Sequence, residues 1–282
     1  MVPPSEKIKK KNMPLLDRVA CSKGRTAALL IGINYTGSSS ALRGCENDVS
    51  RMERWLLDER GFADVEVMTE HRGRPPTAAN IKAALTELAA KTLTGVDKVV
   101  IQYSGHGTHA RDRAKAGAAA DEPDGQDEAW VGCDLATVPD DCIRAALNAM
   151  SPWTRVFLLI DACHSGSSAD LPLLYVYGHE LVSIESQTAP VCDAVMFSGS
   201  KDTQTSADFD DPDTGLATGA MTDAFFDNLD QHDKLVRLKT AMHVYMQDNG
   251  LTQRPQLSTS RPLAPGARLT DYVPIQTGAA QG

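Results

Sequence analysis

The sequence predicts an α/β fold with a central sheet covered by helices on both faces. Short apolar runs of strand length alternate with segments of helical spacing, which is the order typical of α/β domains. The run Val156–Ile160 lacks the polar alternation of a half-buried strand, so we expect a strand buried on both faces. The 282 residues include 42% hydrophobic residues, enough for a substantial core.

The expected strands are short apolar runs, or alternations of apolar and acidic residues, that end in turns or loops. They are Thr26–Ile33, Asp64–Thr69, Val99–Tyr103, Ala129–Cys133, Val156–Ile160, Asp193–Ser198 and Arg254–Ser258. Thr108–Gln126 and Gly199–Gly219 are expected to be long polar loops.

The expected helices have apolar residues three or four positions apart, preceded by a start signal. The first begins with Asn47 or Asp48 near its N-cap and ends at Gly61. The later helices begin at Pro76-Thr77, at Pro139, at about Ala220 and at Lys234. Because no repeat or compositional linker divides the chain, we expect one domain.

Composition argues against several functions. A net charge of -9 and a pI near 5.2 disfavour nucleic acid as a partner. No apolar run approaches the roughly 18 residues of a membrane span, and residues 1–24 lack the apolar core of a signal peptide. We therefore expect a cytoplasmic protein with no membrane partner and free thiols, and a disordered basic tail whose alternative role is nuclear targeting.

Two residues with catalytic chemistry lie at expected strand ends. Cys163 follows Val156–Ile160 by three residues, and His106 follows the strand that ends at Tyr103. Ligands of open α/β sheets bind at the carboxyl ends of the strands, where neighbouring parallel strands can bring two side chains together. A nearby imidazole raises the thiolate fraction and later gives a proton to a leaving amine. The pattern favours a Cys163/His106 dyad over His164, because adjacent side chains diverge at a strand end.

Six short motifs resemble those of the metacaspases, the caspase relatives of plants, fungi, protists and bacteria. They occur in family order and span roughly Thr26 to Leu263. The His and Cys motifs are 103–107 (YSGHG) and 161–166 (DACHSG), and the others are 44–48 (GCEND), 124–128 (DGQDE), 198–208 and 215–221.

The resemblance implies a caspase-like fold, with a mainly parallel central sheet flanked by helices. It divides the chain into a tail (1–25), a peptidase domain (26–272) and a C-terminal tail (273–282). Within the domain it implies a large-subunit-like part (26–178) and a small-subunit-like part (191–272).

The resemblance also implies a cysteine endopeptidase. Cys163 would attack the scissile carbonyl, and His106 would act as general acid and base. The backbone N–H groups of Cys163 and Gly107 would hold the oxyanion, at about 3 kcal/mol per donor.

Specificity for a basic residue at P1 (the substrate residue before the cleaved bond) follows from two acids. Asp161 stands where the Asp-cleaving caspases carry a neutral Gln, and Asp48 matches a second acid of the family's P1 pocket. Two carboxylates in a partly desolvated pocket repel an acid and suit a guanidinium or ammonium, so we predict cleavage after Arg or Lys. Cys45 and Ser104 match other residues of this pocket.

Calcium dependence is implied by four acids that match the family's calcium ligands: Asp127, Asp140, Asp141 and Asp170. Carboxylates in loops suit Ca²⁺, and bringing them together costs on the order of 4 kcal/mol per close pair at an effective dielectric of 20. Asp140 and Asp141 have an alternative role as the acidic first turn of a helix.

The positions of Lys and Arg predict where the chain could cut itself. No Lys or Arg occurs between Arg155 and Lys201, so we expect an active single chain, cut if at all in the tail (Lys7–Arg25) or at Arg111–Arg113. The resemblance implies a monomer. The alternatives are another caspase-fold peptidase, legumain-like or separase-like, or a non-proteolytic calcium-responsive interaction protein.

Overall fold

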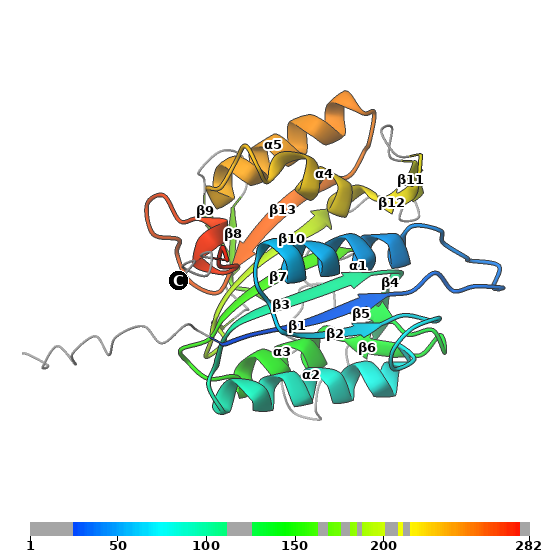
Figure 1. The fold of residues 1–282 in the computed structure, drawn as a ribbon, viewed down its shortest axis with the longest axis horizontal. Helices are drawn as coiled ribbons and strands as arrows, with labels where there is room; N and C mark the ends of the chain where they lie inside the picture. The colour runs from blue at the N-terminus through cyan, green and yellow to red at the C-terminus, as the bar shows by residue number, and fades with distance from the viewer. Residues whose placement is uncertain are drawn as a thin grey trace, which may run out of the picture.

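A central eight-stranded sheet organises the protein (Figure 1). The computed structural model describes residues 25–111, 126–162, 169–175, 181–184, 188–200, 208–210 and 215–276. The strand order is β2-β1-β3-β7-β10-β13-β8-β9. Strands β2, β1, β3, β7 and β10 pair in parallel, whereas β13, β8 and β9 pair antiparallel, so the prediction of a mainly parallel sheet is confirmed.

The strands of this sheet have the following bounds: β1 (Arg25–Gly32), β2 (Asp64–Met68), β3 (Val96–Ser104), β7 (Arg155–Asp161), β8 (Leu173–Tyr175), β9 (Leu181–Ser183), β10 (Asp193–Ser200) and β13 (Arg254–Thr259). A second sheet contains β4 (Gly107–Arg111), β5 (Gln126–Val131) and β6 (Thr137–Pro139), and a third contains β11 (Asp208–Asp210) and β12 (Ala217–Gly219).

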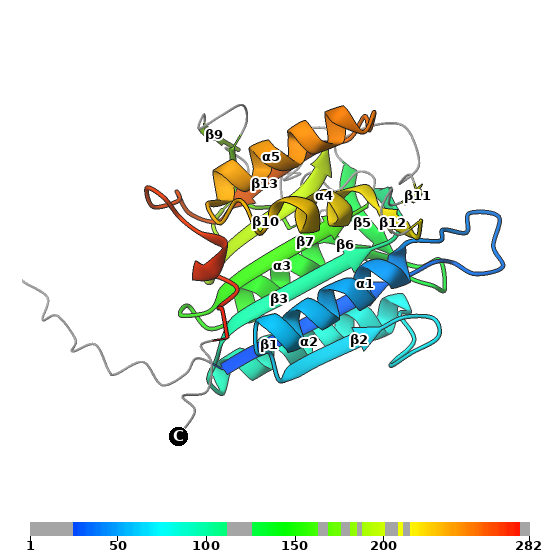
Figure 2. The same cartoon turned by 45° about the horizontal axis from the view of Figure 1, so that its top comes forward.

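Helices cover both faces of the central sheet (Figures 1 and 2). One face carries α1 (Cys45–Arg54), which continues into a π-helical turn (Trp55–Glu59), together with α4 (Ala220–Asn228) and α5 (Leu235–Asp248). The other face carries α2 (Ala78–Leu93) and α3 (Asp140–Ala149), and a 3₁₀ turn (Leu269–Asp271) lies near the C-terminus. None of the helices in the described ranges is long and apolar enough to cross a membrane.

Strand β7 shows why the sheet needs both helical layers. Val156, Leu158 and Ile160 pack with α2 and α3, whereas Phe157 and Leu159 pack with α1, α4 and α5. All five side chains are fully buried. An uninterrupted apolar run is therefore what this strand requires, as its sequence predicted.

Several sequence predictions are wrong in detail. The expected loop after His106 begins with β4, which pairs with β5, and the expected loop before Ala220 contains β11 and β12. The N-cap of α1 is Gly44 rather than Asn47 or Asp48, and the Asn34 side chain accepts a hydrogen bond from the first helical N–H, at Cys45. Sequence analysis also missed β8 and β9.

The strand register places the candidate site. Ser104, at the end of β3, pairs with Asp161 at the end of β7, and the Gly105 N–H donates to the Asp161 carbonyl. On the other side Ser104 pairs with Gly32 of β1. The chain segments that leave these three strands therefore emerge at one edge of the sheet.

Candidate active site

The structure describes most of the predicted site residues. His106, Gly107 and all four predicted residues of the P1 pocket lie at the edge where β1, β3 and β7 end. Asp140, Asp141 and Asp170 are described as well. Cys163 and the side chain of Asp127 lie outside the described residues.

Two buried tyrosines hold the backbone of His106. The His106 N–H donates to the Tyr35 hydroxyl at 2.9 Å, and the Tyr103 hydroxyl donates to the His106 carbonyl at 2.7 Å. The Tyr35 ring also packs against the imidazole, with 4.5 Å between ring centroids and 33° between the ring planes. Burial raises the pKa of both tyrosines, so both stay neutral donors. The histidine backbone is thus fixed on both sides of its Cα.

The imidazole of His106 has a defined tautomer. Its Nε2 lies 2.6 Å from the backbone carbonyl of Ser40. Because a carbonyl oxygen can only accept, Nε2 must carry the proton in this bond. The neutral ring then has its lone pair on Nδ1, which leaves that nitrogen as the base.

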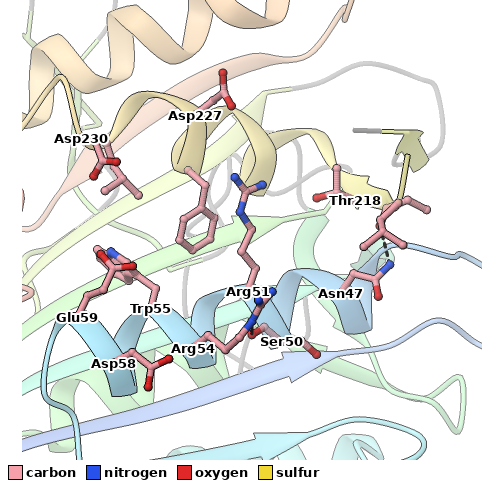
Figure 3. A pocket seen from close by; sticks show the side chains of 14 residues that line it. Asn47, Ser50, Arg51, Arg54, Trp55, Asp58, Glu59, Thr218, Asp227 and Asp230 are labelled. Atoms are coloured by element: carbon pink, nitrogen blue, oxygen red, sulfur yellow. Dashed lines mark hydrogen bonds between the residues drawn. The ribbon is translucent and has the colours of Figure 1, made fainter. Parts of the chain in front are cut away.

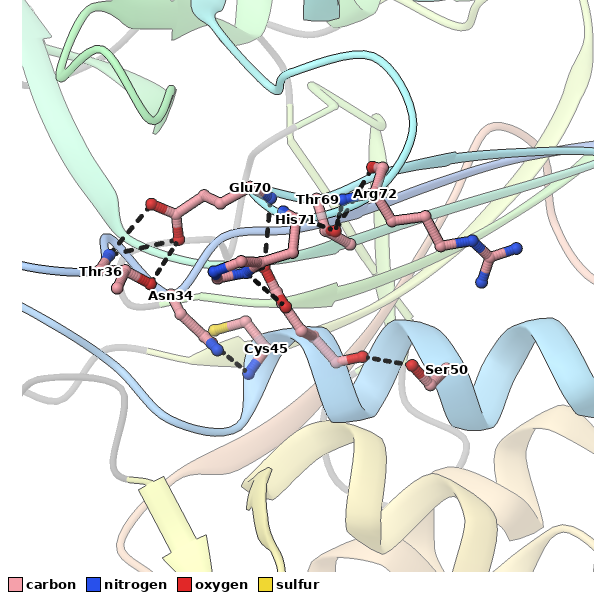
Figure 4. A network of polar contacts seen from close by, with 9 residues as sticks. Asn34, Thr36, Cys45, Ser50, Thr69, Glu70, His71 and Arg72 are labelled. Carbon is pink, nitrogen blue, oxygen red and sulfur yellow. Dashed lines mark hydrogen bonds and ion pairs between the residues drawn. The ribbon is translucent and has the colours of Figure 1, made fainter.

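Hydrogen bonds at Thr36 and Glu70 fix the start of the loop that carries Ser40 (Figure 4). The Thr36 N–H donates to the Glu70 carboxylate at 3.0 Å, and the Glu70 N–H donates to Glu46 of α1 at 3.1 Å. His71 pairs with the same Glu46 carboxylate, and this bond raises the pKa of His71. These contacts join the start of α1, the Ser40 loop and the turn after β2.

The N–H of Gly107 points away from the neighbouring strand. Gly107 pairs with Trp130 of β5, and the Val131 N–H donates to the His106 carbonyl. That bond makes Gly107 and Trp130 a non-hydrogen-bonded pair of the antiparallel ladder. The Gly107 N–H is therefore directed outward from the ladder, as an oxyanion donor must be.

Two buried carboxylates lie together beside this strand end. Asp48 of α1 is 1% exposed and Asp161 of β7 is 3% exposed. Cys45, one turn earlier on α1, and Ser104, the register partner of Asp161, are buried with them. The structure thus brings together the four residues predicted to line a P1 pocket.

The end of β12 holds the Asp48 carboxylate, and the first turn of α4 holds the Asp161 carboxylate. Oδ1 of Asp48 accepts from the Thr218 hydroxyl at 2.7 Å and from the Gly219 N–H at 3.0 Å. Oδ2 of Asp161 accepts from the Thr222 N–H at 2.8 Å, in the first turn of α4. Oδ2 of Asp48 is buried without a hydrogen-bond partner among the described residues.

The environment of the pair favours protonation. Burial, followed by the charge of Asp161, raises the pKa of Asp48 to about 7. Burial also raises the pKa of Asp161 to about 6, although N–H groups at the start of α4 oppose the shift. A cation bound between the two carboxyls would favour their ionised form.

A partly buried ion pair between Arg51 and Asp223 supports the same end of α4. Asp223, 1% exposed, accepts from Arg51 of α1 at 3.1 Å and from the Tyr245 hydroxyl of α5 at 2.6 Å. The Arg51 guanidinium also lies over the Phe226 ring, 4.7 Å from its centroid. Three helices are thus joined around one carboxylate.

Outside this ion pair a groove of about 580 Å³ runs between α1 and the β12–α4 segment (Figure 3). Asn47 lines it and donates from its side chain to the Ala217 carbonyl at 2.8 Å, whereas the neighbouring Asp48 faces inward toward Asp161. Asn47 and Asp48 are adjacent on α1, yet Asn47 lines the groove whereas Asp48 belongs to the buried acid pair.

We expect Arg51→Met to lower the free energy of unfolding by about 1–3 kcal/mol, because it leaves Asp223 buried without its cation. Chemical denaturation measures the change. Arg54→Met is the matched control on the same helix, because the Arg54 side chain is exposed and donates to the Ser50 carbonyl one turn earlier on α1. A loss at Arg51 no larger than the loss at Arg54 would contradict this role.

The predicted calcium acids gather around the start of α3. Asp140 is the first residue of α3, and Arg144, one turn later, donates to the Asp170 carbonyl at 2.6 Å. The carboxylate of Asp140 already accepts from the N–H groups of Glu128 and Asp141. Among the side chains that the structure describes, no three candidate ligand groups lie close enough to hold a metal ion. The calcium ligand set stays a prediction.

Sequence reasoning missed several residues of this site. The Ser40 carbonyl has no signal in a sequence, because any residue supplies one. Thr218, Gly219 and Thr222 lay in or beside a matched motif, yet their contacts with Asp48 and Asp161 join residues 61 to 171 positions apart.

Known proteins are similar to this chain in sequence and in fold. The family model described as "Metacaspase, peptidase C14 domain" matches residues 26–172. Metacaspase-1B of Aspergillus oryzae is 33% identical over 304 residues, covering 86% of this chain and 70% of that protein. Metacaspase-1 of Eremothecium gossypii is 32% identical over 301 residues, covering 85% of this chain and 65% of that protein.

The chain therefore spans about two thirds of the length of these relatives. In structure, it is similar to protein GSU0716 of Geobacter sulfurreducens, with a TM-score of 0.61 at 22% identity over 87% of this chain and 98% of that one, which shows a shared fold. The family match and the relatives together establish that the chain belongs to the metacaspase family of cysteine-type endopeptidases.

Proposed function

We propose that this metacaspase is a calcium-dependent endopeptidase that cleaves peptide bonds after Arg or Lys through a Cys163/His106 dyad. The observation that carries the proposal is the buried Asp48–Asp161 pair beside the strand end that leads to His106. A buried acid pair with raised pKa values is costly for a folded protein, and such groups cluster at functional sites.

The strand register supports the dyad. His106 follows Ser104 by two residues, Cys163 follows Asp161 by two residues, and Ser104 and Asp161 are register partners on parallel strands. Equivalent positions past two neighbouring strand ends can come within reach of each other. The bond from Nε2 of His106 to Ser40 leaves Nδ1 to receive the proton of the thiol.

The chemistry then follows from these groups. Nδ1 of His106 takes the proton of the Cys163 thiol, and the thiolate attacks the scissile carbonyl carbon. The N–H groups of Gly107 and Cys163 stabilise the oxyanion, the C–N bond breaks, and the imidazolium gives its proton to the leaving amine. Water, deprotonated by His106, hydrolyses the thioester and restores the thiol.

The acid pair would select the P1 residue by charge. A guanidinium donates to two carboxylates at once, and an ammonium offers three donors to the same oxygens. Either cation would supply the partner that Asp48 Oδ2 lacks among the described residues. An acidic P1 residue would add a third negative charge to the pocket and is expected to bind poorly.

Calcium is proposed to bind Asp127, Asp140, Asp141 and Asp170. Support comes from the gathering of these positions around the start of α3 and from the hard oxygen donors they supply. Bound calcium would relieve repulsion among the acids. Asp170 lies seven residues after Cys163, so the same ion would order the chain on the C-terminal side of the nucleophile.

Fluorogenic peptides that differ only in their last residue test the proposal. We expect cleavage after Arg and Lys, little cleavage after Asp, loss of activity with a calcium chelator, recovery on adding Ca²⁺, and no activity in Cys163→Ala. Faster cleavage after Asp than after Arg would refute the specificity, and activity unchanged by the chelator would refute the calcium dependence.

We further propose that the chain acts as a monomer and is not cut between its two parts. Arg155 and Lys201 bound a stretch without basic residues, which a protease of this specificity would leave intact. Self-cleavage is expected in Lys7–Arg25 or at Arg111–Arg113.

A further inference from the structure

Gly219, the N-cap of α4, approaches both carboxylates of the acid pair. A Cβ built on Gly219 would lie under 3.0 Å from Oδ2 of Asp161 and from Oδ2 of Asp48. The same residue donates its N–H to Oδ1 of Asp48. Gly219 is therefore in contact with the pair through its backbone on one side and its bare Cα on the other.

Backbone conformation does not require a glycine here. Gly219 has φ -80° and ψ 142°, an extended conformation that any residue adopts. Space is limiting instead, because the atoms that a side chain would meet first are Oδ2 and Cγ of Asp161, followed by Oδ2 of Asp48. A methyl group would have to displace the carboxylates themselves, because they are the nearest atoms.

We propose that Gly219 is a specificity-determining residue that keeps the two carboxylates in the fixed geometry a P1 guanidinium needs. Guanidinium is planar and donates in a rigid fork, so displaced carboxylates lose its paired hydrogen bonds. Ammonium is a compact charge with rotatable donors and tolerates such displacement better. The inference rests on the proposed cleavage after basic residues and assigns the balance between Arg and Lys to this position.

Thr218 is a second residue that holds the Asp48 carboxylate in place. Its hydroxyl donates to Oδ1 of Asp48 at 2.7 Å, next to the Gly219 N–H bond, and its side chain is buried. The two bonds to Oδ1 fix the orientation of the Asp48 carboxylate. Thr218→Val removes the hydroxyl but keeps the size and the backbone.

The test compares the ratio of kcat/KM for two peptides that end in Arg or in Lys and are otherwise identical. Relative to the wild type, we expect Gly219→Ala to lower the Arg/Lys ratio at least about 10-fold, and Thr218→Val to lower it about 3-fold. A defect in folding or in the dyad lowers both substrates equally, so it does not move the ratio.

Gly199→Ala is the matched control. Gly199 lies in β10, its φ is not positive, and the nearest atom to a new Cβ is the flexible end of Gln253, at 3.2 Å. The Arg/Lys ratio of this variant is expected to equal that of the wild type. Thermal denaturation of each variant identifies a loss of folded protein, and in that case Thr218→Val carries the test.

Two outcomes separate this inference from the proposed function. If the wild type cleaves after basic residues and neither Gly219→Ala nor Thr218→Val changes the Arg/Lys ratio, the role of Gly219 is refuted and the proposed specificity stands. If the wild type does not cleave after Arg or Lys, the proposed specificity fails and the inference fails with it. A lower ratio in both variants, with the control unchanged, supports the inference.

Discussion

Replacing His106 by Ala is expected to lower kcat/KM for an Arg-ended peptide by about 10²–10⁴-fold, the usual contribution of a general acid and base. The variant should still fold, because alanine keeps the backbone N–H and C=O bonds to Tyr35 and Tyr103, although it loses the imidazole contacts with Ser40 and the Tyr35 ring. Steady-state kinetics and thermal denaturation together measure the two effects.

His232→Ala is the control for this loss. His232 follows α4, and its backbone N–H donates to the Asn228 carbonyl at 3.1 Å, a bond that alanine also keeps. We expect its kcat/KM within about twofold of the wild type. Equal activity of His106→Ala and His232→Ala would remove His106 from the mechanism.

Replacing Asp48 by Asn is expected to lower kcat/KM for an Arg-ended peptide by at least about 10²-fold, or about 3 kcal/mol, because one carboxylate of the proposed cation site is lost. The same change should stabilise the protein at pH 8. Asparagine keeps an oxygen to accept from Thr218 and Gly219, and it removes one of two buried negative charges. An activity equal to the wild type would refute the role of Asp48 in P1 binding.

The sign of the pH dependence follows from the raised pKa values, about 7 for Asp48 and about 6 for Asp161. A folded-state pKa above the unfolded value means that the folded protein binds the proton more tightly, so this pair stabilises the fold at low pH. That contribution is lost as the pH rises through 6 and 7. Denaturation of wild type and Asp48→Asn at pH 5 and pH 8 should show a larger difference at pH 8.

Activity on basic substrates should change in the opposite direction. Only the ionised pair attracts a cation, so kcat/KM for an Arg-ended peptide should fall as the pH is lowered from 8 to 5.5. The rate of Cys163 alkylation by iodoacetamide, an uncharged probe, corrects for titration of the dyad itself. Identical pH profiles for alkylation and for peptide cleavage would contradict a titrating acid pair.

The elements that the sequence predicted best are those whose burial is continuous. Val156–Ile160 is apolar at every position because both faces of β7 are covered, and this pattern is independent of distant contacts. Strands β8 and β9 have only three residues each. Strand β8 pairs with β13, and β9 pairs with β8. Such short strands depend on tertiary pairing, which no local pattern encodes.

The predicted start of α1 was wrong for a related reason. Asn47 and Asp48 are good N-cap residues, yet the helix begins earlier, because Asn34 from the preceding loop accepts the first helical N–H. Asp48 is instead used inside the fold, where it meets Gly219. A residue type that suits a cap equally suits a buried acid, and only the fold distinguishes the two.

Within the site, residues that carry chemistry in their side chains were predictable, whereas those that act through their backbone were not. His106 and the acid pair were found from motif positions. The carbonyl of Ser40 and the bare Cα of Gly219 act through atoms common to all residues or through the absence of a side chain. Their roles follow from distances, which only coordinates supply.

The strand order has a consequence for any cut between the two parts of the domain. Strand β10, from the second part, lies between β7 and β13, and β13 in turn pairs with β8 from the first part. The two parts are interleaved within one sheet, so a nick between β9 and β10 would free neither fragment without breaking the β7–β10 and β13–β8 pairings. Proteolysis at that junction is therefore a poor means of inactivation, and a nicked protein should migrate as one intact particle until it is denatured.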